Sequence, residues 1–164
     1  MTLATLACAP TDFDFVIGDW HVKHRRLKER LAGSQEWIAF DGAMSTRKVL
    51  GGFGNIEDNI LRFPEGECRA LALRSYDPAT GNWSIWWLDG RFPGRLDVPV
   101  VGRFEHGVGF FFANDTCAGQ PITIRFIWSR LAADLLRWEQ AFSADGGVTW
   151  ETNWTMEFHR TIQA

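Results

Sequence analysis

Short segments in which apolar and polar side chains alternate run along the chain from Trp20 onward, separated by Gly, Pro, Asn and Asp. A period of two is typical of a β-strand with one buried face, and the interruptions predict turns between antiparallel strands. The pattern is clearest over 121–130, where Ile122, Ile124, Phe126 and Trp128 share one face. Ten strands are predicted, at 20–27, 36–50, 55–63, 67–76, 82–89, 98–105, 108–114, 121–130, 134–142 and 153–161. The sequence therefore predicts an all-β fold, an antiparallel up-and-down barrel of about ten strands.

Helix is expected only near the N-terminus. Residues 11–18 are predicted to form one short helical turn, with Thr11 or Asp12 as the N-cap and Gly18 ending it. The stretch 129–136 has a helix-like composition but lies between two strand patterns, so we expect a connection there. We expect a flexible tail over 1–10 and one barrel domain over 11–164.

Two hairpins carry specific turn chemistry. In the stretch 76–83, Pro78 presets one turn position and Gly81 tolerates a positive φ. The stretch 143–150 matches the pattern Ser-x-Asp-x-Gly-x-Thr-Trp, which resembles the Asp box of sialidase-type propellers. A propeller would repeat this unit in each blade, and the sequence contains it once, so it is interpreted as a hairpin.

The surplus of large aromatic rings is the unusual feature of the composition. Nine Trp and 13 Phe stand against one Tyr, so either the core is very aromatic or a cavity is lined with rings. The net charge of -3 provides no general field for nucleic acid, and no apolar run approaches the about 18 residues of a membrane helix. The basic run from Lys23 to Arg30 is interpreted as a solvated hairpin.

The three cysteines, Cys8, Cys68 and Cys117, are odd in number and widely spaced. They indicate neither a disulfide framework nor a zinc site, and they favour a cytoplasmic location.

Gly18-Asp19-Trp20, which opens the first predicted strand, resembles the Gly-x-Trp element of lipocalin-like (calycin) barrels. The resemblance implies that Trp20 closes one end of the barrel and packs against a cation of the last strand, here Arg160. A guanidinium over an indole ring is a favourable contact of about 1 kcal/mol. Together with 13–20, the stretches 50–55 and 76–78 and Trp83 resemble an uncharacterised bacterial lipocalin-like family. That resemblance implies the fold and no activity.

Histidine positions weigh against a haem or metal site. Haem-binding nitrobindins also start with Gly-x-Trp, and His159 would be the axial ligand, but the sequence has Val22 and His24 where the nitrobindin motif needs glycines. If Phe158 points inward, strand alternation turns His159 outward. His21 and His24 lie on opposite faces for the same reason. No cofactor or metal ion is expected.

The predicted ligand-binding residues are Trp87, Asp89, Arg125, Trp138 and Gln140. The strand 83–89 is apolar on both faces, so the N-terminal segment or a second subunit should cover its outer face, or Trp87 lines a pocket whose mouth carries Asp89 and Arg91. Gln140 shares a face with Trp138 and would need a buried partner or a ligand.

Three functions remain open at this point. The first is a carrier or sensor of a small apolar or aromatic molecule. The second is a small enzyme, an isomerase or hydrolase, which would need Asp89, Arg125 and Glu139, with Arg74 as a further candidate, to converge in the cavity. The third is a ligand-free assembly module that dimerises through the strand 82–89.

Overall fold

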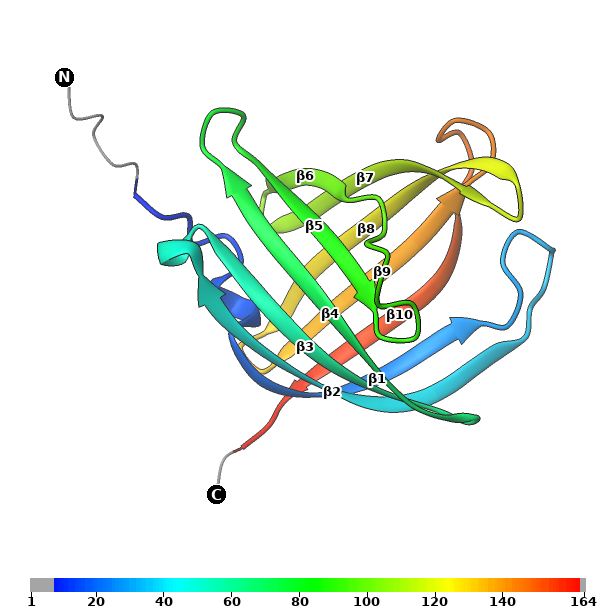
Figure 1. Cartoon of the computed structure of the whole chain (residues 1–164), viewed down its shortest axis with the longest axis horizontal. Helices are drawn as coiled ribbons and strands as arrows, with labels where there is room; N and C mark the ends of the chain where they lie inside the picture. The colour runs from blue at the N-terminus through cyan, green and yellow to red at the C-terminus, as the bar shows by residue number, and fades with distance from the viewer. Residues whose placement is uncertain (1–7, 163–164) are drawn as a thin grey trace.

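Ten antiparallel strands close into a barrel in chain order, with β1 pairing both β2 and β10 (Figure 1). The computed structural model describes residues 8–162, so most of the tail predicted over 1–10 lies outside the described residues. The strands are β1 (Gly18–Leu27), β2 (Trp37–Val49), β3 (Gly54–Phe63), β4 (Gly66–Asp77), β5 (Asn82–Asp89), β6 (Val100–Glu105), β7 (Val108–Cys117), β8 (Gln120–Ala132), β9 (Leu135–Ser143) and β10 (Glu151–Arg160). The predicted up-and-down barrel is confirmed.

The alternation seen in the sequence sets which side chains face the interior. On β8, Ile122 and Trp128 are buried, while Ile124 and Phe126, which have the same parity, line the interior with them. On β10, Met156 and Phe158 are buried in the same way. Because successive side chains of a strand point to opposite faces, each strand contributes every second residue to the core.

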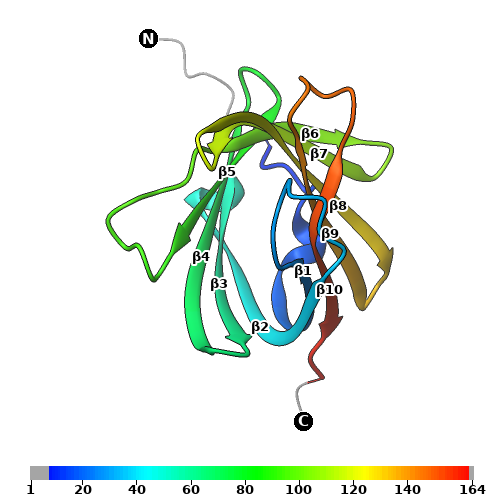
Figure 2. The same ribbon diagram turned by 90° about the vertical axis from the view of Figure 1, so that its right-hand side faces the viewer.

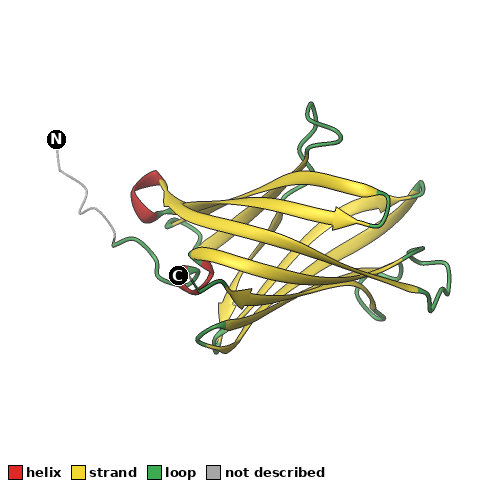
Figure 3. Ribbon diagram, turned by 90° about the horizontal axis from the view of Figure 1, so that it is seen from below, coloured by secondary structure: helices red, strands yellow, loops and turns green. Residues whose placement is uncertain are grey.

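A single 3-10 turn, η1 (Asp14–Val16), fills one end of the barrel and places Phe13 and Val16 in the core. The helical turn is therefore where the sequence predicts it, but the predicted side-chain cap is wrong: the N-cap position is Phe13, with no side-chain cap. The Asp12 carboxylate instead accepts a hydrogen bond from Trp83 Nε1, at 3.1 Å. A second 3-10 turn, η2 (Leu50–Gly52), joins β2 to β3 at the same end (Figure 3).

The first and last strands meet at this end of the barrel. Trp20 pairs in register with Arg160, and the guanidinium carbon lies 4.1 Å from the centre of the Trp20 ring. Trp20 Nε1 donates to Val16 O at 2.9 Å, and Arg160 Nη1 donates to Ile17 O at 3.1 Å. The contact expected from the Gly-x-Trp resemblance is present, and it fastens η1 to the first and last strands.

The opposite end of the barrel carries the longest connections, over 28–36, 90–99 and 144–150, beside short turns such as 118–119 between β7 and β8. The connections from β1 to β2, from β7 to β8 and from β9 to β10 lie together there, toward the viewer in Figure 2. The loop 90–99 between β5 and β6 is tied back to β5 by a bridge between Leu88 and Leu96. Within residues 8–162, no helix has the length and the apolar character needed to cross a bilayer. One end is thus closed by η1, and the other is bordered by loops.

Candidate functional site

A cavity of about 320 Å³ occupies the interior between η1 and the loop-bearing end. Seven aromatic side chains contribute to its walls: Phe63, Trp87, Phe126, Trp128, Trp138, Phe142 and Trp154. Charged side chains follow where the strands end, namely Arg26, Arg30, Asp89, Arg91, Arg95, Asp97 and Asp115. The volume lies at the lower end of the range for small-molecule sites, and an apolar chamber with a few polar groups is the usual form of such a site.

The rings of the cavity wall meet edge to face. Trp154 lies at a steep angle to both Trp138 and Trp87, with ring centres 5.6 Å and 6.3 Å apart. Trp138 in turn contacts Phe126 edge-on at 4.9 Å. These contacts hold each indole in one orientation, and the edge-to-face geometry is the favourable one for aromatic pairs. The wall is therefore built from rings that support one another.

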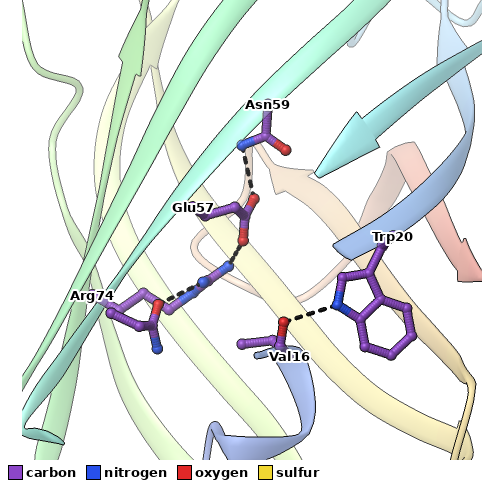
Figure 4. Close-up of polar contacts among 6 residues, drawn as sticks. Val16, Trp20, Glu57, Asn59 and Arg74 are labelled. Carbon is purple, nitrogen blue, oxygen red and sulfur yellow. Dashed lines mark hydrogen bonds and ion pairs between the residues drawn. The ribbon is translucent and has the colours of Figure 1, made fainter. Parts of the chain in front are cut away.

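A buried polar network forms the floor of the cavity (Figure 4). Arg74 is only 1% exposed and donates to Glu57 Oε2 and, at 2.8 Å, to Asn55 Oδ1. Asn59 Nδ2 donates to the other oxygen of Glu57 at 2.9 Å. The Arg74 guanidinium also lies over the rings of Phe13 and Trp128, at 5.0 Å and 4.9 Å. Further hydrogen bonds make a buried charge pair tolerable, and here they engage Glu57 and both Nη atoms of Arg74, while Arg74 Nε has no partner among the described residues.

Four of the five predicted ligand-binding residues line this cavity: Trp87, Asp89, Trp138 and Gln140. Asp89 is held by Arg91, whose Nη2 and Nε lie 2.7 Å and 3.0 Å from its carboxylate oxygens. The hydrogen bonds from Arg91 lower the pKa of Asp89. Gln140 has a protein partner, because its Nε2 donates to Asn153 Oδ1 at 2.8 Å.

The fifth predicted residue, Arg125, is not among the residues that line the cavity. It lies between Ile124 and Phe126, which point inward, so the alternation of β8 turns it to the outer wall. There its guanidinium stacks over Trp150 at 4.3 Å. The prediction that Arg125 binds a ligand in the cavity has no support from this position.

The groups that the enzyme hypothesis requires do not converge. Glu139 pairs with Arg137 at 3.2 Å, on the side of β9 opposite Trp138 and Gln140. Arg125 is also on the outer wall, whereas Asp89 is at the cavity mouth. Of the four candidates named from the sequence, only Asp89 and Arg74 line the cavity, and each already has an ionic partner.

The histidines follow the parity of their strands. His159 is half-exposed on the outer wall, 2.6 Å from Glu157. His24 points inward, stacks on Phe40 and accepts a hydrogen bond from Trp154 Nε1 at 3.2 Å. Burial, and to a lesser extent the charge of His21, lowers the pKa of His24 to about 3, so it is neutral at ordinary pH. In the described part of the chain, no three His, Cys, Asp or Glu side chains gather as a metal site would require.

Arg26 is a cavity residue that the sequence pattern was not taken to predict. The run from Lys23 to Arg30 was interpreted as a solvated hairpin, yet Arg26 lies in the cavity lining, with its guanidinium 4.8 Å from the Trp154 ring centre. The signal was present in the sequence, because Trp20, Val22, His24 and Arg26 share one parity on β1. That parity separates Arg26 from its exposed neighbour Arg25.

Comparisons with known proteins support the fold. No protein-family model and no curated protein sequence matches the chain. Among solved structures, the chain is similar to the S-type phycobiliprotein lyase CPES from Guillardia theta, with a TM-score of 0.56 and 9% identity, over 93% of this chain and 92% of that one. It also matches EF1p2_mFAP2b, solved bound to DFHBI, with a TM-score of 0.49 and 8% identity, over 90% and 95% of the two chains. At these identities, the likeness to the lyase shows a common barrel fold.

Proposed function

We propose that this protein binds a small aromatic molecule inside the barrel, as a carrier or sensor. The observation that carries the proposal is the cavity of about 320 Å³ walled by seven aromatic side chains. Ring walls give a flat aromatic ligand favourable stacking or edge contacts, and burying the ligand removes apolar surface from water. A cavity of this size fits a molecule of a few fused or linked rings.

Polar atoms without partners at the floor support a ligand with a hydrogen-bond acceptor. Among the described residues, Trp128 Nε1 and Arg74 Nε are buried and have no hydrogen-bond partner. Both side chains line the cavity. A buried donor without a partner is costly, so an acceptor on the ligand, such as a carbonyl or ether oxygen, would stabilise the complex.

Trp86 and Trp87 provide a matched pair for the test, because they are adjacent on β5 and only Trp87 lines the cavity. Purified protein is titrated with aromatic metabolites, flavins, porphyrins and fatty acids, and binding is followed by tryptophan quenching and thermal shift. We expect an aromatic member of the set to bind. Trp87→Ala should weaken its binding about tenfold or more, while Trp86→Ala leaves it unchanged. If no compound binds, or if both variants weaken binding equally, the proposal is wrong.

We further propose a cytoplasmic location. Cys8, Cys68 and Cys117 are all free thiols. A reducing compartment keeps such thiols unpaired. Cys68 and Cys117 lie in the cavity lining, and burial raises the pKa of the Cys68 thiol, which keeps it in its less reactive form.

A homodimer remains a second hypothesis, and the outer wall over β5 to β7 favours it. Val101, Phe110 and Phe112 are 38%, 36% and 45% exposed, and Val101 pairs in register with Phe112. Trp86 and Leu88 extend this apolar face along β5. In the described part of the N-terminal segment, Phe13 packs inside the barrel against Trp83 and not on this face. A second copy of the chain would bury these side chains.

A further inference from the structure

Arg26 is a cation inside the cavity that no polar group of the described residues engages. Its side chain makes no hydrogen bond or ion pair there, and its Nε is buried without a partner. The guanidinium lies between two rings of the wall, 4.8 Å from the centre of Trp154 and 5.9 Å from the centre of Phe63. These rings hold the group in place but leave its N–H donors unused. The side chain is partly buried, and the cost of withdrawing a cation from water falls when a bound group supplies a hydrogen-bonding partner.

The charges around Arg26 leave it unneutralised. Asp89 is the acid whose charge bears on Arg26, and it is held by Arg91 through Nη2 and Nε. Arg30 also lies in the lining and adds positive charge. Burial, followed by the repulsion of Arg30 and Arg91, lowers the pKa of Arg26 to about 10, which still leaves it charged at neutral pH. This side of the mouth therefore presents a positive field to anything that enters.

At the floor of the cavity, unlike at the mouth, the positive charge is balanced by a protein group. Arg74 is already paired with Glu57 and hydrogen-bonded to Asn55, so its charge is balanced within the protein. An anion bound at the floor would lie close to Glu57. Arg26 is therefore the better partner for a negative group on the ligand.

We propose that the ligand is an aromatic anion whose carboxylate pairs with Arg26 while its rings lie against Trp87, Trp138 and Trp154. This inference rests on the proposed function and names the chemical class of the ligand. A guanidinium presents two parallel N–H donors that match the two oxygens of a carboxylate, and such charge-assisted bonds are about twice as strong as neutral ones. The rings that sandwich Arg26 place its charge beside the aromatic walls, so one molecule can reach both.

A matched pair of probes tests the inference on the unmodified protein. 2-Naphthylacetate and 2-naphthylacetamide have the same rings and nearly the same shape, but only the first carries a charge. Isothermal titration calorimetry at low salt should show the carboxylate binding about tenfold or more tightly than the amide. Because the preference is electrostatic, it should shrink as salt is added.

Arg25 and Arg26 supply the control variants. Arg25 is exposed and stacks over Trp37 on the outer wall, whereas Arg26 lies in the cavity. Arg26→Gln should abolish the preference for the carboxylate and leave the affinity for the amide nearly unchanged, and Arg25→Gln should keep the preference. Arg26→Lys keeps the charge but loses the two parallel N–H donors, so it should show an intermediate preference for the carboxylate.

The outcomes separate this inference from the proposed function. Equal binding of the two probes to the unmodified protein, or a preference that survives Arg26→Gln, overturns the anion assignment while the aromatic site stands. Failure of both probes also overturns it, and the wider compound set then decides whether any aromatic ligand binds. The comparison of the two probes on the unmodified protein tests the inference even if a variant does not fold.

Discussion

Trp20 and Arg160 show how two residues 140 positions apart can decide whether the barrel closes. The Trp20 ring is 1% exposed, packs under the Arg160 guanidinium at 4.1 Å and hydrogen-bonds to Val16. Trp20→Ala removes a large buried ring and should lower the free energy of unfolding by about 3–5 kcal/mol. Arg160→Lys keeps a cation over the ring and should cost about 1 kcal/mol or less. Chemical denaturation measures both values, and small, equal losses would contradict this role.

His24 makes the stability of the protein depend on pH. In the folded chain its pKa is lowered from 6.5 to about 3, mainly by burial. Between these values the unfolded chain binds a proton that the folded chain does not. The free energy of unfolding should therefore fall as the pH is lowered from about 6.5, by at most about 1.4 kcal/mol per pH unit.

Variants on the same strand isolate this contribution. His24→Gln keeps a hydrogen-bond acceptor near Trp154 but cannot titrate, so its stability should change less between pH 6.5 and 4.5. His21→Gln, at an exposed position on the same strand, should retain most of the slope, because burial is a larger cause of the lowered pKa of His24 than the charge of His21. Asp97, whose pKa is raised by burial, acts in the opposite direction and is present in all three proteins. Urea unfolding at a series of pH values gives the slopes, and identical slopes for the three proteins would rule out His24 as the cause.

The seam between β5 and β6 is the shortest strand pairing in the described barrel. It has three register pairs, from Trp83–Gly102 to Ile85–Val100, whereas β1 and β2 pair over ten. β6 begins at Val100, after Pro99, which cannot donate to a ladder. Beyond Ile85, the loop replaces β6, with Asp97 N donating to Trp87 O at 2.9 Å. The predicted strand over 98–105 is therefore two residues shorter than expected.

Hydrogen exchange should find the lowest protection among the paired strands at this seam. Elements with few backbone pairs open at a lower free-energy cost than the rest of a fold. We expect the amides of Asp97 and of Val100–Gly102 to exchange faster than those of β1 and β2. Trp87 and Val100 border both the seam and the cavity, so a bound ligand should slow this exchange. Equal protection across all strands would show that the seam does not open preferentially.

In the whole molecule, the outer face of the barrel wall should affect the oligomeric state, and the inner face should affect ligand binding. If the apolar outer face over β5 to β7 is an interface, light scattering at micromolar concentration should give twice the chain mass of 18.7 kDa. Phe110→Lys together with Phe112→Lys should then give monomers, because two charges would be buried at the contact. Ligand binding should persist in these monomers, since neither side chain lines the cavity. A monomeric unmodified protein would eliminate the dimer hypothesis.

Alternation along the chain is enough to predict the strands and the side of the wall that most residues face. Alternation is a local property, because each residue projects opposite to its neighbour whatever the rest of the chain does. Alternation therefore predicts that Trp138 and Gln140 share a face, and both line the cavity, whereas the strand 83–89 is apolar on both faces and leaves the direction of Trp87 open. The same parity, applied to β1 and β8, places Arg26 inside and Arg125 outside.

Which inward side chains meet depends on how distant strands pair in the closed barrel. Arg74 and Glu57 lie 17 positions apart, Trp154 and His24 lie 130 apart, and their contacts depend on the register between strands and on the curvature of the closed sheet. These contacts determine which charges are balanced. Asp89 forms an ion pair with Arg91, and Glu57 forms one with Arg74. Arg26 lies over Trp154 and has no ionic partner among the described residues. Parity along a strand says that a charge faces the cavity, but the energy of that charge depends on neighbours brought from distant strands.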